Sequence, residues 1–290
     1  MLRHRLALPA LLLHRCHSTF RPAQTGFRAL LFHDIADDRL DAFRTFARHA
    51  RDRWGTIDPD GAAAWLTGDG AAPSQSGPTP CLFTFDDGFA SNYRVAREIL
   101  KPLGIRALFF VCPALVDLEG PEQRAAIAAQ IFRAQCDAAD LPPGQRLMTW
   151  DELRALKAAG HEIGSHGFTH KRLTELDEKT LETEIRSARD RLETEMGDEI
   201  PWYAFTFGDI GSISDRELRV IARMHRFCRS GVRGMNGRGT APHAVRADAV
   251  DLDGPESYRA LIAEGGLDGR YREARQKLDL MATGYNRASA

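Results

Sequence analysis

The sequence predicts an α/β fold in which parallel strands alternate with helices, and two observations carry this prediction. First, residues 81–85 and 105–111 are apolar runs typical of buried strands, and residues 91–100 between them have a helical pattern. A strand–helix–strand order implies parallel neighbours joined by a right-handed crossover. Second, residues 81–85 and 161–165 are each followed at once by polar side chains, as in α/β barrels whose sites lie at strand ends.

The remaining elements follow from periodicity and from helix caps. Thr149 followed by Glu152 is a capping box, and Gly160 ends the helix that it starts. Ser91 is expected to cap the helix after the central strand. The other expected elements, in chain order, are a strand at 27–35, a helix at 40–53, a loop at 68–80, helices at 121–140, 176–196 and 214–225, strands at 227–232 and near 250, and one peripheral helix after 264.

Composition excludes several classes of protein. A chain of 290 residues permits one large domain or two small ones, and a hydrophobic fraction of 43% with 27% charged residues is ordinary for a globular protein. With 39 basic against 40 acidic residues, nothing suggests a nucleic-acid groove or a polybasic membrane patch. No apolar run approaches the roughly 20 residues that a membrane span needs. The sequence makes no prediction of oligomeric state.

The first 26 residues are expected to be a separate N-terminal segment, either disordered or a weak targeting signal. Arg3 and Arg5 precede the apolar residues 6–13, which is the outline of a signal peptide, but no small-residue cleavage site follows. The five cysteines show no metal or disulfide spacing, and they are Cys16, Cys81, Cys112, Cys136 and Cys228. These features favour reduced thiols and a cytoplasmic location.

Two pairs of polar residues are the candidate site. Gly88 allows a sharp turn after the strand at 81–85, so that the adjacent Asp86 and Asp87 can diverge into one cleft. His166 and His170 follow the second strand, and two histidines plus a carboxylate, with one position open, are the ligands of a catalytic zinc. Each pair alone is more often a solvated turn or a pair of surface histidines. Their joint occurrence at strand ends favours a site.

The segments "TFDDG" and "TWDELRALKAAGHEIGSHGFTHKRL" resemble the polysaccharide deacetylase family (carbohydrate esterase family 4, the NodB-homology domain), over roughly residues 27–251. The resemblance implies a distorted (β/α) barrel with about seven parallel strands, in a catalytic domain at 27–265 followed by a C-terminal helix and tail at 266–290. It implies that Asp86 is the catalytic base and that Asp87, His166 and His170 bind a divalent metal, most likely Zn²⁺. The implied reaction removes N-acetyl groups from an amino-sugar glycan or its precursor and releases acetate.

The sequence departs from the family pattern at the third motif. Residues 202–208 align with that motif, but Ala204 stands where the family has an arginine that orients the base. The orienting contact must therefore come from elsewhere or be absent. The backbone N–H of Phe207 needs no particular side chain and is the expected oxyanion donor. The family's late histidine, its general acid, has no match, and His33 and His243 are the best substitutes.

Three alternatives remain open from the sequence. One is hydrolysis of another amide, such as an N-formyl sugar or a ureide, and another is a glycan-binding relative with weakened catalysis, as Ala204 suggests. The Gly- and Arg-rich residues 231–239 are either a mobile loop or a phosphate contact through Arg233 or Arg238, which would suit a phosphate-linked sugar. A serine hydrolase is excluded because no Gly-x-Ser-x-Gly elbow occurs.

Overall fold

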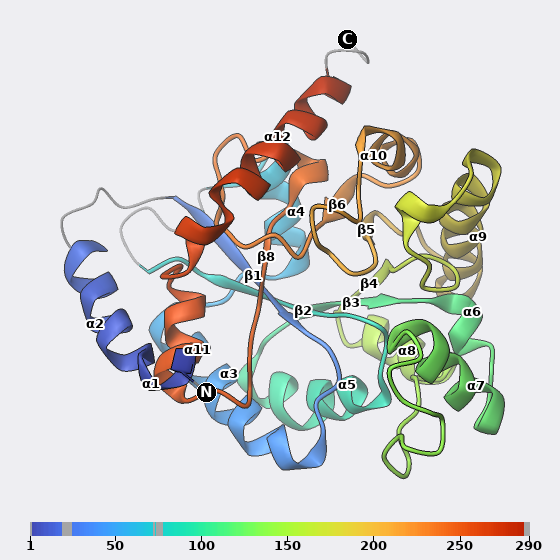
Figure 1. The fold of residues 1–290 in the computed structure, drawn as a ribbon, viewed down its shortest axis with the longest axis horizontal. Coiled ribbons are helices and arrows are strands. Elements are labelled where there is room, and N and C mark those ends of the chain that lie inside the picture. The colour runs from blue at the N-terminus through green and yellow to red at the C-terminus, as the bar shows by residue number, and fades with distance from the viewer. Residues whose placement is uncertain (1, 19–24, 72, 74–77, 287–290) are drawn as a thin grey trace.

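The fold is built around one curved, mostly parallel sheet of eight strands (Figure 1). The computed structural model describes residues 2–18, 25–71, 73 and 78–286. The strands are β1 (Gly26–Phe32), β2 (Cys81–Phe85), β3 (Ala107–Val111), β4 (Glu162–Ser165), β5 (Trp202–Ala204), β6 (Phe227–Arg229), β7 (Asn236–Gly237) and β8 (Ala247–Ala249). Their order is β6-β5-β4-β3-β2-β1-β7, with β8 also paired to β1.

The sheet curls towards closure between its first and last parallel strands. β8 pairs in parallel with β1, and an isolated parallel bridge joins Arg229 of β6 to Val245, just before β8. Only the two-residue β7 pairs antiparallel, so seven of the described strands are parallel. The predicted distorted (β/α) barrel with about seven parallel strands is confirmed.

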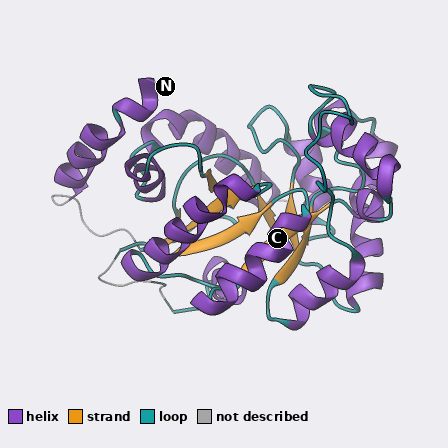
Figure 2. Ribbon diagram, turned by 90° about the horizontal axis from the view of Figure 1, so that it is seen from below, coloured by secondary structure: helices purple, strands orange, loops and turns teal. Residues whose placement is uncertain are grey.

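Helices lie on both sides of the strands and cover the outside of the sheet (Figure 2). The α-helices are α1 (Leu2–Arg5), α2 (Ala7–Ser18), α3 (Leu40–Arg53), α4 (Pro59–Thr67), α5 (Ala90–Val95), α6 (Pro113–Val116), α7 (Gly120–Ala126), α8 (Trp150–Ala158), α9 (Glu178–Met196), α10 (Asp215–Ala222), α11 (Glu256–Ala263) and α12 (Arg272–Asn286). Two π-helical turns, η2 (Ala96–Leu100) and η4 (Ile127–Ile131), extend α5 and α7.

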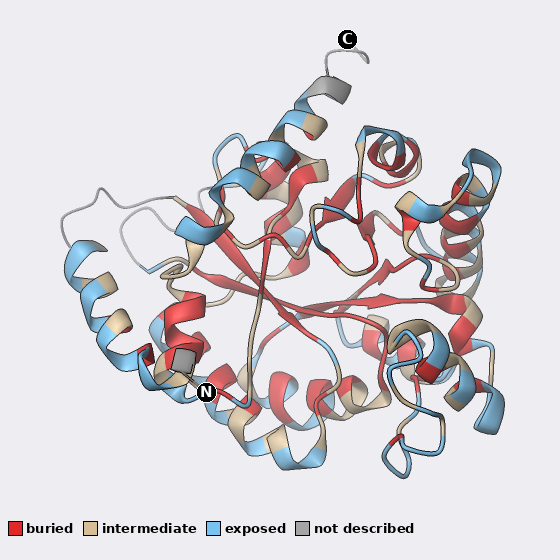
Figure 3. Ribbon diagram, viewed as in Figure 1, coloured by how far each residue is buried: buried red, intermediate tan, exposed pale blue. Residues whose placement is uncertain are grey.

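The strands are buried on both faces, as expected for a parallel sheet covered by helices (Figure 3). This burial explains why β1, β2 and β3 are mostly apolar on both faces; the exceptions, Arg28 in β1 and Thr84 in β2, are hydrogen-bonded to Asp248 and to the carbonyl oxygen of Leu30. On one face, phenylalanine rings from neighbouring strands stack, with the ring centroids of Phe85 and Phe109 4.9 Å apart and those of Phe32 and Phe85 5.4 Å apart. Such aromatic pairs stabilise a core beyond the apolar area that they bury.

Two helix predictions are wrong in detail. Ser91 does not cap the helix after β2, because α5 begins at Ala90 and the Ser91 hydroxyl instead donates to Asp34 Oδ1 at 2.5 Å. The helix expected at 121–140 ends with η4 at Ile131. The chain beyond it turns back and buries Leu141 in an apolar cluster with the helix that precedes it, so tertiary packing overrides local helical preference.

Both ends of the chain join the main core. In α2, Ala7 and Leu11 are buried against α11, so this part of the N-terminal segment is helical and docked, not disordered; whether it is also a targeting signal stays a prediction. In α12, Leu278 and Ala282 are buried in a cluster with α10, so the terminal helix is less peripheral than expected. No helix in the described part of the chain is long and apolar enough to span a bilayer.

Candidate metal centre and active site

Residues that follow four of the strands converge at the carboxyl-terminal edge of the sheet. Parallel strands all present their carboxyl ends at one edge, where α/β proteins assemble their sites. The residues are His33 after β1, Asp86 and Asp87 after β2, His166 and His170 after β4, and Phe207 beyond β5. The turn after β2 depends on Gly88, whose φ is 77° and where an added Cβ would lie 2.9 Å from the Val111 side chain.

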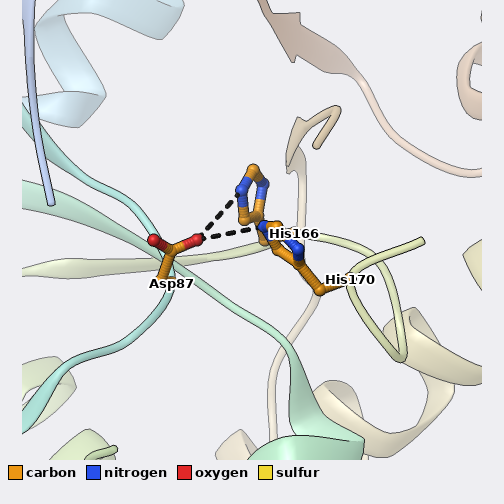
Figure 4. Close-up of side chains that lie close together, drawn as sticks. All are labelled: Asp87, His166 and His170. Atoms are coloured by element: carbon orange, nitrogen blue, oxygen red, sulfur yellow. Dashed lines mark ion pairs between the residues drawn. The ribbon is translucent and has the colours of Figure 1, made fainter. Parts of the chain in front are cut away.

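Asp87, His166 and His170 form a buried triad that fits a metal ion (Figure 4). Asp87 Oδ1 lies 3.5 Å from His166 Nε2 and 3.2 Å from His170 Nε2. Two ligand atoms at about 2.05 Å from one tetrahedral Zn²⁺ lie about 3.3 Å apart, so these separations suit a shared cation. These three side chains meet in the structure, as the sequence predicts; their role as metal ligands and the identity of the ion stay predictions.

The backbone holds both imidazoles in the tautomer that metal binding needs. His166 Nδ1 lies 2.7 Å from the carbonyl oxygen of Ala204, and His170 Nδ1 lies 3.0 Å from that of Gln130. A carbonyl oxygen only accepts, so each Nδ1 carries a hydrogen, and Nε2, which faces Asp87, is the atom that a neutral ring offers to a metal. Gln130 lies in the π-helical turn η4, and such turns often occur at functional sites.

The charges of the triad favour an ionised carboxylate beside neutral imidazole. Burial acts to raise the pKa of Asp87, but the hydrogen bond to His170 and the positive potential of nearby histidines outweigh burial and lower it. Burial lowers the pKa of His166 to about 4, so this ring is neutral at neutral pH. Burial also acts to lower the pKa of His170, but its hydrogen bond to Asp87 raises it overall.

Asp86 is held by an arginine that the sequence analysis missed. Arg229 Nη2 donates to Asp86 Oδ1 in an ion pair, and both side chains are buried, at 1% and 3% residue exposure. Arg229 is the register partner of Ala204 on the adjacent parallel strand, and paired residues of parallel strands face the same side. The guanidinium therefore comes from β6 in this chain, whereas the family pattern places the arginine on the strand that corresponds to β5, at the position of Ala204.

The missed arginine had a weak signal in the sequence. A charged residue inside the apolar strand predicted at 227–232 is unusual, because a buried charge requires a partner. Only the strand register shows that this partner is Asp86. The other carboxylate oxygen, Asp86 Oδ2, lies 4.0 Å from His166 Nε2 and faces the triad.

Phe207 lies where the sequence analysis placed it, on the cavity beside the triad. Its ring centroid is 5.1 Å from that of His170, and its φ of 67° is left-handed, a strained conformation for a bulky residue. The N–H of Phe207 has no hydrogen-bond partner among the described residues. The next residue, Gly208, accepts at its carbonyl from Gly231 N at 2.9 Å, which ties this loop to the end of β6.

The two candidates for general acid are not equivalent. His33 is exposed, follows β1 directly and lines the cavity. His243 does not line the cavity. Its Nε2 lies 3.0 Å from the carbonyl oxygen of His225, which precedes β6, at the end of that strand away from the site. The prediction for His243 is therefore corrected, because its ring is engaged outside the cavity.

The predicted phosphate contact in residues 231–239 is also corrected. Arg233 Nη2 donates to the carbonyl oxygen of Ala249 at 2.6 Å, and Arg238 lies over the ring of Trp65 at 5.5 Å. Neither guanidinium lines the cavity, so neither is placed to contact a substrate there.

The cavity over the triad is large enough for a sugar unit and its neighbours. Its volume is about 960 Å³, near the upper end of the usual range for ligand sites. One wall is apolar and comes partly from the irregular segment after η4, with Phe89, Phe132 and Leu141. Acidic side chains also line the cavity, among them Asp34 and Asp37 from the segment after β1.

Comparison with known proteins identifies the family of this site. The sequence profile of the family described as polysaccharide deacetylase matches residues 74–225, more than half of the chain. The chain therefore belongs to the polysaccharide deacetylase family, and it is a hydrolase of the carbohydrate deacetylase class. Among curated proteins, none matches its sequence.

Solved structures share the fold at low sequence identity. A deacetylase from Streptococcus pyogenes, PplD, in complex with acetate has a TM-score of 0.63 and 14% identity, over 83% of this chain and 100% of that one. IcaB from Ammonifex degensii has a TM-score of 0.60 and 18% identity, over 83% and 97% of the two chains. A de-N-acetylase from Aggregatibacter actinomycetemcomitans has a TM-score of 0.60 and 14% identity, over 80% and 97%.

Replacing Arg229 tests its action on Asp86. Arg229→Met leaves a buried carboxylate without its cation, so we expect kcat/KM to fall on the order of 10²-fold while bound metal stays unchanged. Arg229→Lys keeps the charge and should recover part of this loss. The measurements are kcat/KM and metal content for each variant, alone and combined with Asp86→Asn. An equally large further loss when Arg229→Met is added to Asp86→Asn would show that the arginine does not act through Asp86.

Proposed function

We propose that this protein is a metal-dependent deacetylase that hydrolyses N-acetyl groups of an amino-sugar glycan or glycan precursor and releases acetate. The observation that carries the proposal is the buried triad of Asp87, His166 and His170 with the paired carboxylate Asp86 beside it. A divalent cation on this triad, most simply Zn²⁺, would polarise the substrate carbonyl and make water a stronger acid.

Asp86 is the base in the proposed reaction. Its Oδ1 is engaged by Arg229, which fixes the orientation of the carboxylate, while Oδ2 faces the triad and is available to take a proton from the attacking water. The N–H of Phe207 donates a hydrogen bond to the substrate carbonyl oxygen, which becomes an oxyanion when water attacks the carbonyl carbon. Because Phe207 is held in a left-handed conformation, this donor is oriented before the substrate arrives.

His33 is the proposed acid. An amide nitrogen leaves as an amine only after it gains a proton, so a donor must reach it from the cavity. Apart from the two triad histidines, His33 is the only imidazole among the described residues that line the cavity. The ladder of β1 and β2 pairs Phe32 with Phe85, which places His33 next to Asp86.

The pairing of Asp86 argues against a catalytically weakened glycan-binding relative. Ala204 suggested that alternative because the family arginine is missing from its strand. The guanidinium of Arg229 compensates for the loss from the neighbouring strand, at the position paired with Ala204. A protein without turnover gains nothing from orienting the base in this way.

The two aspartates are expected to separate in their effects. Asp86→Asn should lower turnover by at least about 10²-fold and leave bound metal unchanged, because only the base is lost. Asp87→Asn should lower both turnover and the amount of bound metal, because it removes a proposed metal ligand. The assay is acetate and formate release from N-acetylglucosamine oligomers and N-formylglucosamine, with metal analysis of each variant and of chelated protein. Loss of metal from Asp86→Asn would contradict this division of roles. Release of formate without acetate would show that the enzyme removes N-formyl groups instead of N-acetyl groups.

The role of His33 is tested by changing the leaving group. His33→Asn should lower the hydrolysis of an N-acetyl sugar on the order of 10²-fold, but it should leave 4-nitrophenyl acetate hydrolysis nearly unchanged, because nitrophenolate leaves without a proton. His243→Asn is the matched control and should change neither rate. Equal losses on the amide and the ester would contradict the assignment of His33 as the acid.

A further inference from the structure

A second depression adjoins the cavity across the ring pair formed by His170 and Phe207. Its volume is about 430 Å³, and both rings line it as well as the main cavity. Its other charged lining residues are Arg133, Lys171 and Arg172, against the single acidic residue Glu175. The depression is therefore basic, whereas the wall of the main cavity after β1 is acidic.

The positive charge of this depression is only partly neutralised. Two guanidinium groups flank the ring of Phe207, with the carbon atom of Arg133 5.0 Å and that of Arg172 4.6 Å from the ring centroid. Arg172 is paired, since it lies 3.3 Å from Asp209 Oδ2 and also donates to Ser212. Arg133 and Lys171 form no ion pair with any residue that the structure describes.

The backbone fixes the place of Arg133 beside Phe207. Arg133 and Ala134 follow the π-helical turn η4 and have left-handed φ angles of 53° and 54°. Consecutive non-glycine residues in this region are costly, and the surrounding structure has to enforce them. The result is a cation beside the ring of Phe207, the residue whose N–H we assign to the oxyanion.

We infer that this depression binds an anionic group, a phosphate or a carboxylate, carried by the substrate next to its N-acetylated sugar. The inference rests on the proposed function and names the class of substrate. A planar guanidinium and an ammonium together match the oxygens of such groups, and two unneutralised cations gain more from an anion than from a neutral sugar. The site lies on Arg133 and Lys171, not on the arginines of residues 231–239.

The test compares anionic and neutral ligands with one acetamido group. Calorimetry would measure the binding of N-acetylglucosamine 1-phosphate, N-acetylglucosaminuronic acid and methyl N-acetylglucosaminide, and acetate release would give kcat/KM for each. We expect the anions to bind about tenfold more tightly than the neutral glycoside at low salt, a difference that Arg133→Ala/Lys171→Ala removes. Tighter binding of the phosphate or of the uronate identifies which anion the site takes.

Arg226→Ala is the matched control. Arg226 is also an exposed arginine beside a phenylalanine ring, 5.5 Å from the ring centroid of Phe227, but it precedes β6 and lies away from the depression. It should change no binding constant. Equal affinities for all three ligands, or a double variant that keeps the preference, would overturn the inference and leave the proposed function standing. Absence of acetate release from every ligand would instead count against the proposed function, while the calorimetry still decides the subsite.

An independent observation concerns the outer face of the N-terminal helix. Five large hydrophobic side chains are exposed in the described residues, and four of them lie close together at 6–13: Leu6 (55%), Leu8 (55%), Leu12 (53%) and Leu13 (61%). Figure 3 shows α2 exposed along most of its length, beside α11. Exposed apolar groups that gather in one place mark interaction surfaces.

The helix cannot rotate to bury these leucines, because its other face is fixed. Ala7 and Leu11, four residues apart on that face, are buried against α11. Arg15 donates through Nε and Nη2 to both carboxylate oxygens of Glu264, at 2.9 and 2.7 Å. The leucines of α2 therefore face outwards in the folded protein.

We propose that this leucine face rests on a membrane surface that contains anionic lipids. Charge supports this occupant: residues 2–18 contain no aspartate or glutamate, and Arg5 and His17 are exposed next to the leucines. An apolar helix face with basic neighbours binds in the headgroup region of anionic bilayers. α2 has 12 residues, which is too short to span a bilayer.

The test is co-sedimentation of the full chain with vesicles of phosphatidylcholine alone and of phosphatidylcholine with 30% phosphatidylglycerol. We expect binding to the anionic vesicles, about tenfold weaker binding for Leu8→Ser/Leu12→Ser/Leu13→Ser, and weaker binding at high salt. Leu280→Ser is the control, since Leu280 is 73% exposed on α12.

Wild-type protein that stays in the supernatant, or a triple variant that binds as well as wild type, would overturn the membrane proposal. A concentration-dependent dimer that the triple variant abolishes would also overturn it, because a second copy of the chain would then cover this face.

Discussion

The buried ion pair between Asp86 and Arg229 is the interaction on which the rest of the site depends. Two charges removed from water are stable only together, so the pair fixes the position of β6 relative to β2 across the interior of the half-barrel. It also selects one rotamer for the carboxylate, which leaves a single oxygen facing the triad. The orientation of the Asp86 carboxylate and the position of β6 relative to β2 thus have one physical cause.

The metal triad is supported by backbone groups instead of by further side chains. The carbonyl oxygens of Ala204 and Gln130 orient the two imidazoles, and one of them comes from a strand end while the other comes from a π-helical turn. Asp87, His170 and Phe207 all have left-handed φ angles, so strain gathers where the site has to be rigid. Packing elsewhere in the fold compensates for this strain.

The surroundings of the site divide by charge. Acidic side chains follow β1, whereas the depression beyond Phe207 is basic, and His170 and Phe207 line both the cavity and the depression. A substrate with charge at one end would be oriented by this arrangement before any specific hydrogen bond forms. The N-terminal helix, with its outward leucines, is a separate feature, and our membrane proposal for it concerns the location of the protein, not its substrate.

The sequence by itself determined the α/β class, the strands around residues 81–85, 107–111 and 162–165, and the meeting of Asp86, Asp87, His166 and His170. These features are local, because apolar runs form strands and the residues after parallel strands reach one edge. Tertiary structure alone decided that Arg229 takes the place of the arginine missing at Ala204, and that His243 lies outside the cavity. It also decided that the helix ends at Ile131, where the chain turns back and buries Leu141. Each depends on strand register or on packing between segments distant in the chain, which local sequence patterns do not encode.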